Sequence, residues 1–330
     1  MHLDVFRSDG FNLSTLSRGI TQVPFMPTRL GRLGLFAQEP ITTTTVAFEM
    51  QDETLVMVQN KPRGAPATPV AANRRKLRDF RAAHLPTGVS ILADEVQNLR
   101  AFGQESEEAT AQAWLQRKMA IARRRIELTQ EYHRMGAIRG QVLDSDGSTV
   151  ILDLFSEFGV SQQTLDFALN VDTTKVLQKV VTLKRMVEDE LGGVPYTGLR
   201  VECSPEFFDA FTGHPLVRDA FTYYQQTFKS SDVRDGFVFG GVLWEEYRGQ
   251  VGSTRFIEAK AAYVVPEGVP DLFIQHYAPA PYTETVNTMG LPFYAKMEPM
   301  DFDKGFDVEL QSNPLTLCTR PRALVKLTTP

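Results

Sequence analysis

The stretch that decides the fold is ESEEATAQAWLQRKMAIARRRIELTQEYHRMGAIRG, residues 105–140. It contains no proline, and Gly136 and Gly140 lie near its end, so a single long helix is expected over about residues 104–140. Ser106 is a suitable N-cap, and the carboxylates after it favour the positive end of the helix dipole. Apolar residues recur at helical spacing, while basic residues cover the other faces. The pattern indicates either a surface helix laid across a sheet or a spine that links two lobes and faces other subunits.

The composition of the whole chain limits its class. A chain of 330 residues is expected to form one large or two to three small domains. The net charge of −5 argues against a protein whose main task is to coat nucleic acid. Cys203 and Cys318 form no spaced cluster, so we expect no disulfide framework or zinc site, and a reducing compartment. The chain has neither a signal peptide pattern nor an apolar run of membrane-spanning length, so a soluble intracellular product is expected.

Residues 1–40 do not have the pattern of a compact domain. Glycine and proline interrupt every run, so no mature helix or strand is expected there. The segment is nevertheless rich in Phe and Leu, whereas a disordered tail is poorer in apolar residues. We therefore predict an extended arm that buries its side chains against its own domain or against a neighbour.

Residues 41–92 are predicted to form an extended β-hairpin. β-Branched residues fill its first strand, and the loop over 60–69 contains three prolines and a glycine. Basic residues cluster on the returning strand, over 74–81. Two interpretations of this cluster stay open: a solvated edge that prevents unwanted strand pairing, or a docking surface for acidic side chains of a partner subunit. Nucleic-acid binding ranks third, because no aromatic residues lie between the charges.

The remaining sequence predicts a mixed α/β region followed by strands near the C-terminal end of the sequence. We expect a hairpin around Asp146-Gly147, a helix over 173–191 and a helix capped by Ser204. The other expected elements are a strand over 199–203, a helix over 214–228, a strand pair over 237–248 broken at Gly240-Gly241, a strand over 256–265, and strands at 308–310 and over 315–327 that complete a sheet under the long helix.

No pattern of catalytic residues emerges. The five histidines are scattered, and the sequence contains no nucleophile elbow, phosphate loop or dinucleotide fingerprint. Asp144-x-Asp146-Gly147 resembles the opening of a calcium loop, but Phe155 stands where the closing Glu belongs. The pairs Asp301/Asp303 and Glu245/Glu246 are interpreted as solvated faces, and Cys203 as a core residue. We expect no enzyme, no cofactor and no metal site.

Several short motifs resemble one known family. They run in the family's order over nearly the whole chain, and they are turn and core signatures without a catalytic motif. They are residues 140–159, 207–211 with 214–217, 244–249, 266–270, 277–280, 285–288, 311–315 and 320–321. On these residues the chain is similar to the lambda-type major capsid proteins of tailed bacteriophages, the capsid E family.

The resemblance implies an α+β fold, the tailed-phage or Hong Kong 97-like major capsid fold. Its parts are expected to be an N-terminal arm (1–40), an extended loop (41–92), a peripheral domain with the spine helix at 104–140 (93–171), an axial domain (172–285) and a C-terminal return to the peripheral domain (286–330).

The resemblance also implies a function. We expect hexamers and pentamers that form an icosahedral shell around double-stranded DNA packed without sequence-specific binding, with no membrane involved. A virion component assembled in the host cytoplasm, with scaffold, portal and decoration proteins as partners, is implied. Lys–Asn cross-linking, known in some capsids of this fold, is not expected at Asn60 and Lys61, because no catalytic Glu partner is evident.

The residues predicted to contact neighbouring subunits are basic: Lys61, Arg63, Arg74, Arg75, Arg78, Arg123, Arg124 and Arg125. Two rival functions stay open. An encapsulin-like nanocompartment shares the fold but encloses enzymes, and a soluble α/β enzyme would stay monomeric and respond to substrate.

Overall fold

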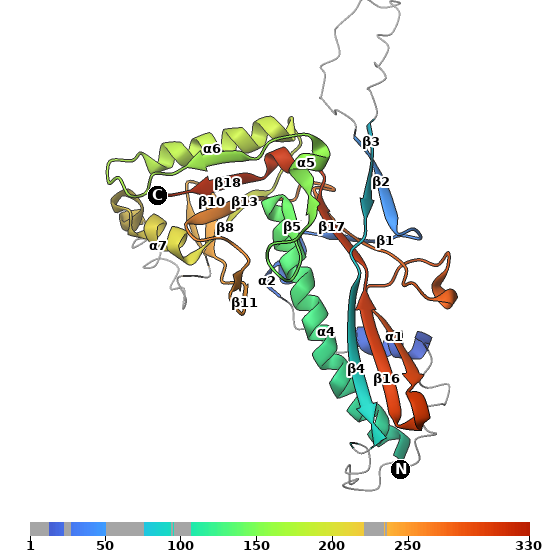
Figure 1. Cartoon of the computed structure of the whole chain (residues 1–330). Helices are drawn as coiled ribbons and strands as arrows, with labels where there is room; N and C mark the ends of the chain where they lie inside the picture. Colours follow the sequence, from blue (N-terminus) through green and yellow to red (C-terminus); the bar gives the residue numbers. More distant parts are fainter. Residues whose placement is uncertain are drawn as a thin grey trace, which may run out of the picture. The chain divides into compact units, whose positions relative to one another are not determined.

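The computed structural model describes residues 13–22, 28–50, 76–93, 95, 107–220, 234 and 236–330 (Figure 1). The chain forms two compact units, and each is built from separate stretches of sequence. Unit 1 comprises Met1–Val46, Phe80–Arg134 and Ile274–Thr316. Unit 2 comprises Ala47–Asp79, Met135–Phe273 and Leu317–Pro330.

The predicted long helix is confirmed as α4, Glu107–Arg139. Its residues up to Arg134 belong to unit 1 and its last turn to unit 2. The helix ends at Arg139, and the next residue, Gly140, has a φ of 83°. A Cβ at this position would lie 2.1 Å from the ring of Phe155, so only glycine fits both the conformation and the space.

Unit 1 contains an antiparallel sheet in the order β15-β16-β4, formed by Tyr294–Pro299, Gly305–Ser312 and Leu85–Leu92. Apolar residues of α4 pack with this sheet in one core, and α4 runs beside β4 and β16 (Figure 1). The side chains on the α4 side of this core are Leu115, Met119, Ala122 and Ile126, and those on the sheet side include Ile91, Ala295, Val308 and Leu310.

The prediction that residues 1–40 form no mature helix or strand is wrong for the described part. Helix α1, Leu13–Gln22, is followed by α2, Arg29–Leu33, and by strand β1, Ala37–Pro40. Leu16 and Ile20 of α1 are buried in the same core as α4. Their spacing of four residues is helical, and the burial that it provides outweighs the cost of Gly19 inside the helix. The expectation that the segment buries apolar side chains within its own chain is met by these two residues.

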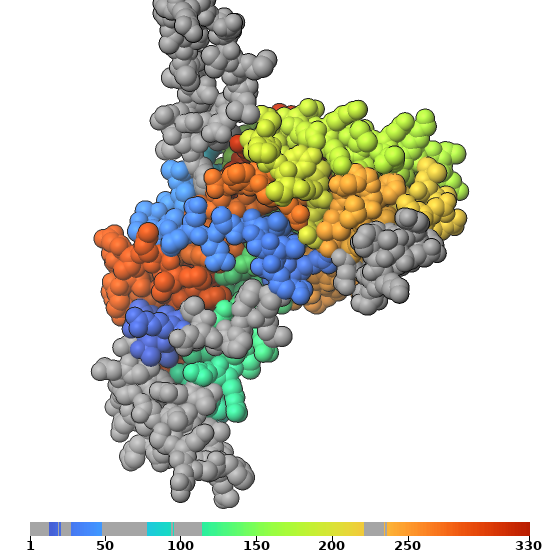
Figure 2. Space-filling view, turned by 180° about the vertical axis from the view of Figure 1, so that it is seen from behind, coloured from blue at the N-terminus to red at the C-terminus, as the bar shows by residue number. Residues whose placement is uncertain are grey.

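Strand β1 joins a second sheet, most of whose residues belong to unit 1. Its order is β1-β14-β17, with β14 at Phe273–Tyr277 and β17 at Pro314–Cys318. β1 runs parallel to β14, and Ile41 donates its N–H to the Tyr277 carbonyl at 2.9 Å. Figure 2 accordingly shows the light-blue residues after α2 beside orange-red residues from the last part of unit 1.

The predicted hairpin of residues 41–92 is described only at its base. Strand β2, Thr45–Met50, pairs with β3, Lys76–Arg81. Residues 51–75, which include the loop over 60–69, lie outside the described residues. The final part of the range forms β4, which pairs with β16 rather than with the hairpin.

Unit 2 is built on a six-stranded mixed sheet in the order β7-β18-β13-β8-β10-β9. These strands are Gln163–Asp166, Val325–Thr328, Ala261–Glu267, Gly198–Cys203, Val242–Glu246 and Phe237–Phe239. The strand predicted at 256–265 begins only at Ala261, because residues 256–260 form a bend and a turn. The strand pair broken at Gly240-Gly241 is confirmed as β9 and β10.

Two helices share the core of this sheet. Helix α6, Val176–Leu191, buries the five apolar residues predicted for one face and ends at Gly192 in the left-handed conformation. Helix α7, Pro205–Gly213, is capped as predicted, since the Ser204 hydroxyl accepts the N–H of Phe207. Phe207 and Phe211 of α7 stack with Trp244, which is fully buried. Of the helix predicted over 214–228, residues 215–220 are helical, and 221–228 lie outside the described residues.

Short elements complete both units. The hairpin predicted around Asp146-Gly147 is confirmed as β5, Gln141–Leu143, and β6, Val150–Asp153. The other elements are α5 (Leu154–Phe158), β11 (Gln250–Val251), β12 (Thr254–Arg255), η4 (Thr283–Thr285), η5 (Asp301–Asp303) and η6 (Pro321–Ala323).

The closing strands do not share one sheet. β16 pairs with β4 and β15 in unit 1, whereas β18 pairs with β7 and β13 in unit 2. β17 pairs in the sheet with β1 and β14. The prediction that strands at 308–310 and over 315–327 complete one sheet under the long helix therefore holds for β16 and not for β17 or β18. The contiguous domain boundaries expected from the sequence stay a prediction.

Candidate assembly surfaces

The turn between β15 and β16 presents an exposed aromatic side chain. Phe302 lies between Asp301 and Asp303 in η5, and it is 90% exposed, the most of any large apolar side chain in the described residues. Phe302 and Asp303 have φ values of 63° and 52°, in the left-handed region. This conformation costs a non-glycine residue about 1–2 kcal/mol, so the strands on both sides must hold the turn in place. We call residues 301–303 the tip.

The strands below the tip are tightly packed. Met300 donates its N–H to the carbonyl of Gly305 at 2.9 Å, which closes the turn. A Cβ on Gly305 would lie only 2.1 Å from the carbonyl oxygen of Ile91 on β4. β4 and β16 therefore approach each other closely at the base of the tip, and this fixes the direction in which the tip projects.

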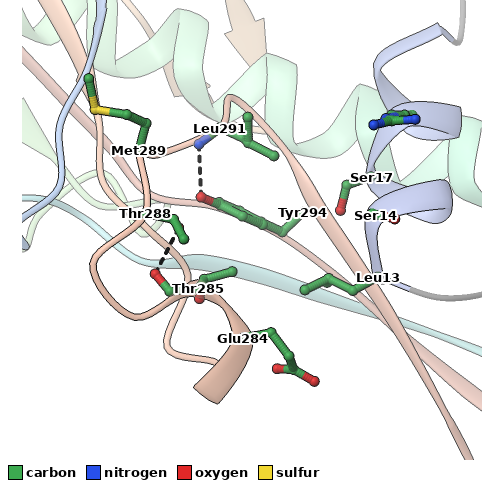
Figure 3. A pocket seen from close by; sticks show the side chains of 10 residues that line it. Leu13, Ser14, Ser17, Glu284, Thr285, Thr288, Met289, Leu291 and Tyr294 are labelled. Carbon is green, nitrogen blue, oxygen red and sulfur yellow. Dashed lines mark hydrogen bonds between the residues drawn. The ribbon is translucent and has the colours of Figure 1, made fainter.

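A second feature of unit 1 is an apolar pocket of about 860 Å³ between α1 and residues 284–294. Figure 3 shows Leu13, Ser14 and Ser17 of α1 on one side, and residues of the 284–294 segment on the other. Tyr294 lies across the pocket, and its hydroxyl accepts the N–H of Leu291 at 2.8 Å. We call this space the α1 pocket.

The wall of the α1 pocket is anchored from both sides. Ser17 accepts the N–H of Ala295 at 3.2 Å, which ties α1 to the first residues of β15. A Cβ at Gly290 would lie 2.0 Å from the carbonyl oxygen of Tyr277, so the 284–294 segment passes directly over the end of β14. The Thr288 hydroxyl donates to the Thr285 carbonyl at 2.8 Å and closes a turn within the loop. Packing and hydrogen bonds thus fix the segments that line the pocket.

Two charged residues lie in the lining of the α1 pocket. Arg18 and Glu284 belong to its lining. Lys296 pairs with Glu284 at 3.2 Å. Backbone hydrogen bonding at Glu284 itself, and then the hydrogen bond from Lys296, lower the pKa of this carboxyl. Glu284 is therefore ionised and locally neutralised, which leaves Arg18 as the cation of the pocket lining.

The basic residues predicted as intersubunit contacts divide into three groups. Lys61, Arg63, Arg74 and Arg75 lie outside the described residues. Arg78 lies on β3, and its guanidinium is 4.0 Å from the Glu157 carboxylate, with both side chains roughly half exposed. A pair of this kind contributes little to stability, so Arg78 stays accessible to another partner.

The third group shows that consecutive arginines on α4 face different surroundings. Arg123 is 6% exposed, pairs with Glu127 at 2.6 Å and lies over the ring of Phe293, with 4.7 Å from its Cζ to the ring centroid. It also donates to the Ile20 carbonyl of α1. These contacts make Arg123 an internal group of unit 1. Arg124 and Arg125 are exposed.

The sequence pattern placed Ile121 and Leu128 on an apolar stripe of the helix, apart from the basic residues, and this placement is wrong. Ile121 and Leu128 are exposed on α4, and residues 117, 121, 124, 125 and 128 share one helix face by their spacing. We call these five residues the outer face of α4. The helical spacing of these residues shows in the sequence that they share a face. The sequence does not reveal which face of the helix the sheet covers.

The remaining acidic candidates have ordinary structural roles. Asp146 accepts hydrogen bonds from the Ser148 and Thr149 N–H groups and from the Thr149 hydroxyl. The Thr149 hydroxyl, followed by the two N–H groups, holds the pKa of Asp146 well below its usual range. Glu245 and Glu246 are buried, so their interpretation as a solvated face is wrong. Glu245 pairs with Arg200, and Glu246 with Arg248 at 3.5 Å. Within the described residues, no group of three or more His, Cys, Asp or Glu side chains could hold a metal ion.

Cys203 and Cys318 are buried free thiols, which confirms Cys203 as a core residue. His214 is also buried, with Nε2 3.1 Å from the carbonyl oxygen of Val171, so it is a structural residue of unit 2. No helix in the described part of the chain is long and apolar enough to cross a membrane.

Comparison with known proteins decides between these surfaces and a catalytic function. The family model of the phage major capsid protein E matches residues 12–329. The chain belongs to this family. The resemblance expected from the sequence motifs is thereby confirmed.

Two relatives of this capsid family cover almost the whole chain. The major capsid protein of Salmonella phage Felix O1 is 28% identical over 351 residues, covering 96% of this chain and 95% of the relative. The major capsid protein of Pseudomonas phage KPP10 is 29% identical over 343 residues, covering 96% and 97%.

Among solved structures, a protein assigned as the capsid protein of an Escherichia coli CFT073 prophage superposes with a TM-score of 0.57. It is 13% identical and covers 97% of this chain and 99% of its own. The chain thus has the Hong Kong 97-like fold. It is a structural protein of the tailed-phage virion and not an enzyme, and self-association is part of its role.

Proposed function

We propose that the chain assembles through hexamers and pentamers into an icosahedral shell that encloses double-stranded DNA. The observation that carries this proposal is the match to the major capsid protein E family over residues 12–329. In this proposal, residues 93–171 with the spine helix serve as the peripheral domain, and residues 172–285 as the axial domain around the symmetry axes. The scaffold, portal and decoration partners and assembly in the host cytoplasm belong to the same proposal.

The proposed contacts between subunits are electrostatic in part. Arg78, Arg124 and Arg125 are described and accessible, and Lys61, Arg63, Arg74 and Arg75 complete the proposed set. Arg123 acts within its own chain, so we leave it out of the set. The net charge of −5 supports acidic surfaces on neighbouring copies as the targets, and enclosed DNA held without base-specific contacts.

The direct test is electron microscopy of the purified protein, expressed alone and together with its upstream neighbour gene. Closed shells, tubes or capsomer rings are expected. A uniform small monomer or dimer under both conditions would contradict the proposal. Shells that enclose a cargo enzyme instead of DNA would establish the nanocompartment function.

The contacts are tested by reversing three charges together, Arg74→Glu, Arg75→Glu and Arg78→Glu. The expected product is a folded chain that forms no shells, because like charges then face each other across the interface. The matched control changes the same three positions to lysine, which keeps the charge and is expected to retain assembly. Normal shells from the charge-reversed variant would remove these residues from the proposed interface.

A further inference from the structure

We propose that the tip of one copy inserts Phe302 into the α1 pocket of a second copy. This inference rests on the proposed function, since it identifies one contact by which copies of the chain recognise each other. The knob and the socket are both described residues of unit 1, and they come from different surfaces of the same protein.

The tip has the properties of a knob. Phe302 exposes 90% of its surface on a turn whose backbone is in the left-handed region. Within its own chain, the Lys304 ammonium lies over the ring, with 5.5 Å from its Nζ to the ring centroid, and the rest of the apolar ring faces outward. Burial of the ring against a partner would offset the cost of exposing this apolar surface. Aromatic side chains are frequent anchors at the centres of protein interfaces, because they bury a large area with little loss of conformational entropy.

The α1 pocket has the properties of a socket. Its volume of about 860 Å³ is ample for one aromatic ring and the residues beside it. Leu13, Met289 and Leu291 provide apolar walls, and Tyr294 provides an aromatic one. Met289 and Leu291 are exposed, as is the neighbouring Val286, so apolar surface continues outside the opening. A methionine beside an aromatic guest is a favourable neighbour, because its flexible thioether adapts to the shape of a ring.

The charges of the two surfaces complement each other. Asp301 and Asp303 flank the knob, and Arg18 stands in the lining of the socket. The other charged residue of the lining, Glu284, is already paired with Lys296 at 3.2 Å. Insertion of Phe302 therefore brings a carboxylate toward a cation, with Asp301 as the proposed partner of Arg18. This pairing fixes the orientation of the inserted ring.

The knob cannot fill its own socket. Tyr294 is the first residue of β15, and the tip follows the last residue of that strand. A six-residue strand spans about 20 Å, and β15 is held straight by its pairing with β16 along its whole length. The distance between the two ends exceeds the reach of any side chain. The tip that enters this socket is therefore that of another copy.

A contact of this kind joins different patches on the two partners. The copy that inserts its tip still has its own socket for another neighbour, and the copy that receives it still has its own tip. The contact is therefore heterologous and extends to rings or larger closed assemblies. A self-complementary dimer contact would stop after two copies. The inferred contact therefore suits a shell protein.

The first test is cross-linking between two separately purified variants. One carries Phe302→Cys and an affinity tag, and the other carries Met289→Cys and no tag. Both native cysteines are buried, so they do not compete. On mixing under assembly conditions and mild oxidation, a disulfide dimer of tagged and untagged chains is expected. Phe302→Cys mixed with Val150→Cys, an exposed position on β6, is the matched control. Equal yields from the two mixtures would overturn the inference.

The second test measures assembly. Phe302→Ser is expected to raise the protein concentration at which shells form by about tenfold or more, the change typical of a lost aromatic anchor. Arg18→Glu is expected to weaken assembly, and Arg18→Glu combined with Asp301→Arg to restore it. Circular dichroism of each unassembled variant confirms that the fold is intact. If the double variant recovers assembly, Arg18 pairs with Asp301. If it does not, Arg18→Glu weakens assembly for another reason.

The outcomes separate this inference from the proposed function. If the wild-type chain forms shells and Phe302→Ser forms them at the same concentration, the tip contact is wrong while the function stands. If the wild-type chain forms no assembly of any kind, the proposed function fails first, and the inference fails with it.

Discussion

The Glu131 carboxylate of α4 accepts the backbone N–H of Leu30, in the first turn of α2, at 2.7 Å. The same carboxylate accepts the Thr28 hydroxyl at 2.6 Å and the Gly31 N–H at 3.3 Å. Helix α2 has no side-chain cap of its own, because the Thr28 hydroxyl points to Glu131 instead. A residue about one hundred positions later in the chain thus caps a short helix, and its charge suits the positive end of the helix.

Replacing this cap should destabilise unit 1. Glu131→Ala leaves buried N–H groups without an acceptor, so we expect the free energy of unfolding to fall by roughly 1–3 kcal/mol. Glu131→Gln keeps one acceptor oxygen and should lose less. Denaturant unfolding of unassembled protein measures both values. Hydrogen exchange of the Leu30 and Gly31 amides should accelerate in the alanine variant, and unchanged protection there would show that the cap is not needed.

The close approach of β16 to β4 predicts a difference between two glycines. Gly305→Ala would place its Cβ 2.1 Å from the Ile91 carbonyl oxygen, so the strands must shift, at a cost of about 1–3 kcal/mol or more. A Cβ added at Gly88 of β4 would have no atom within 4 Å, so Gly88→Ala should change stability little. Thermal unfolding of the two variants compares them. Equal melting temperatures would contradict the close packing at the base of the tip.

A buried histidine predicts a dependence of stability on pH. Burial lowers the pKa of His276, and this effect exceeds the opposing influence of Glu39, whose carboxylate is 3.5 Å away on β1. The unfolded chain therefore binds a proton more readily than the folded chain below the ordinary histidine pKa of 6.5. This contribution to stability is complete above about pH 6.5 and is lost as the pH falls from there toward the folded pKa.

The measurement is a series of denaturant unfolding curves between pH 5 and 8 for the wild type and His276→Gln. The wild type should lose more stability on acidification than the variant does. His84→Gln, a change at an exposed histidine, controls for the loss of a titratable ring alone. Parallel pH profiles for wild type and His276→Gln would show that His276 makes no contribution.

The aromatic core of unit 2 predicts a large effect at one residue. Trp244 is fully buried, with its ring centroid 4.0 Å from that of Phe211 and 5.6 Å from that of Phe167. Trp244→Ala should lower the free energy of unfolding by about 3–5 kcal/mol, because it leaves a large cavity. Trp244→Phe should lose less, although it removes the hydrogen bond from the indole N–H to the Phe239 carbonyl. Near-ultraviolet circular dichroism and unfolding curves report both changes, and a loss below 1 kcal/mol for alanine would contradict the packing.

Local sequence signals predicted the regular elements well. The long helix follows from the absence of proline and from apolar spacing, and it is observed at Glu107–Arg139. All five apolar positions predicted for one face of α6 are buried, because a period of four residues on a helix identifies a face without reference to the partner. Ser204 caps α7 as predicted, because a serine hydroxyl directly before the first turn of a helix accepts one of its unpaired N–H groups.

Features that depend on distant segments could not be predicted in the same way. Arg123, Arg124 and Arg125 are chemically equal, and only the position of α1 and Phe293 makes Arg123 internal. The α1 pocket combines residues from the beginning and the end of the chain. The Asp301/Asp303 pair was interpreted as a solvated face, whereas the informative residue is Phe302 between them, whose exposure depends on the backbone of the turn.

Strand β18 lies between two other strands, β13 on one side and β7 on the other. Among the described strands, β18 is the only neighbour of β7, although β7 precedes it by more than 150 residues in the sequence. The six-stranded sheet therefore cannot close before residues 325–328 have been synthesised. A chain truncated before β18 would retain an open sheet. In such a chain β7 and β13 would lose their shared neighbour, and their unpaired edges could pair with other chains instead.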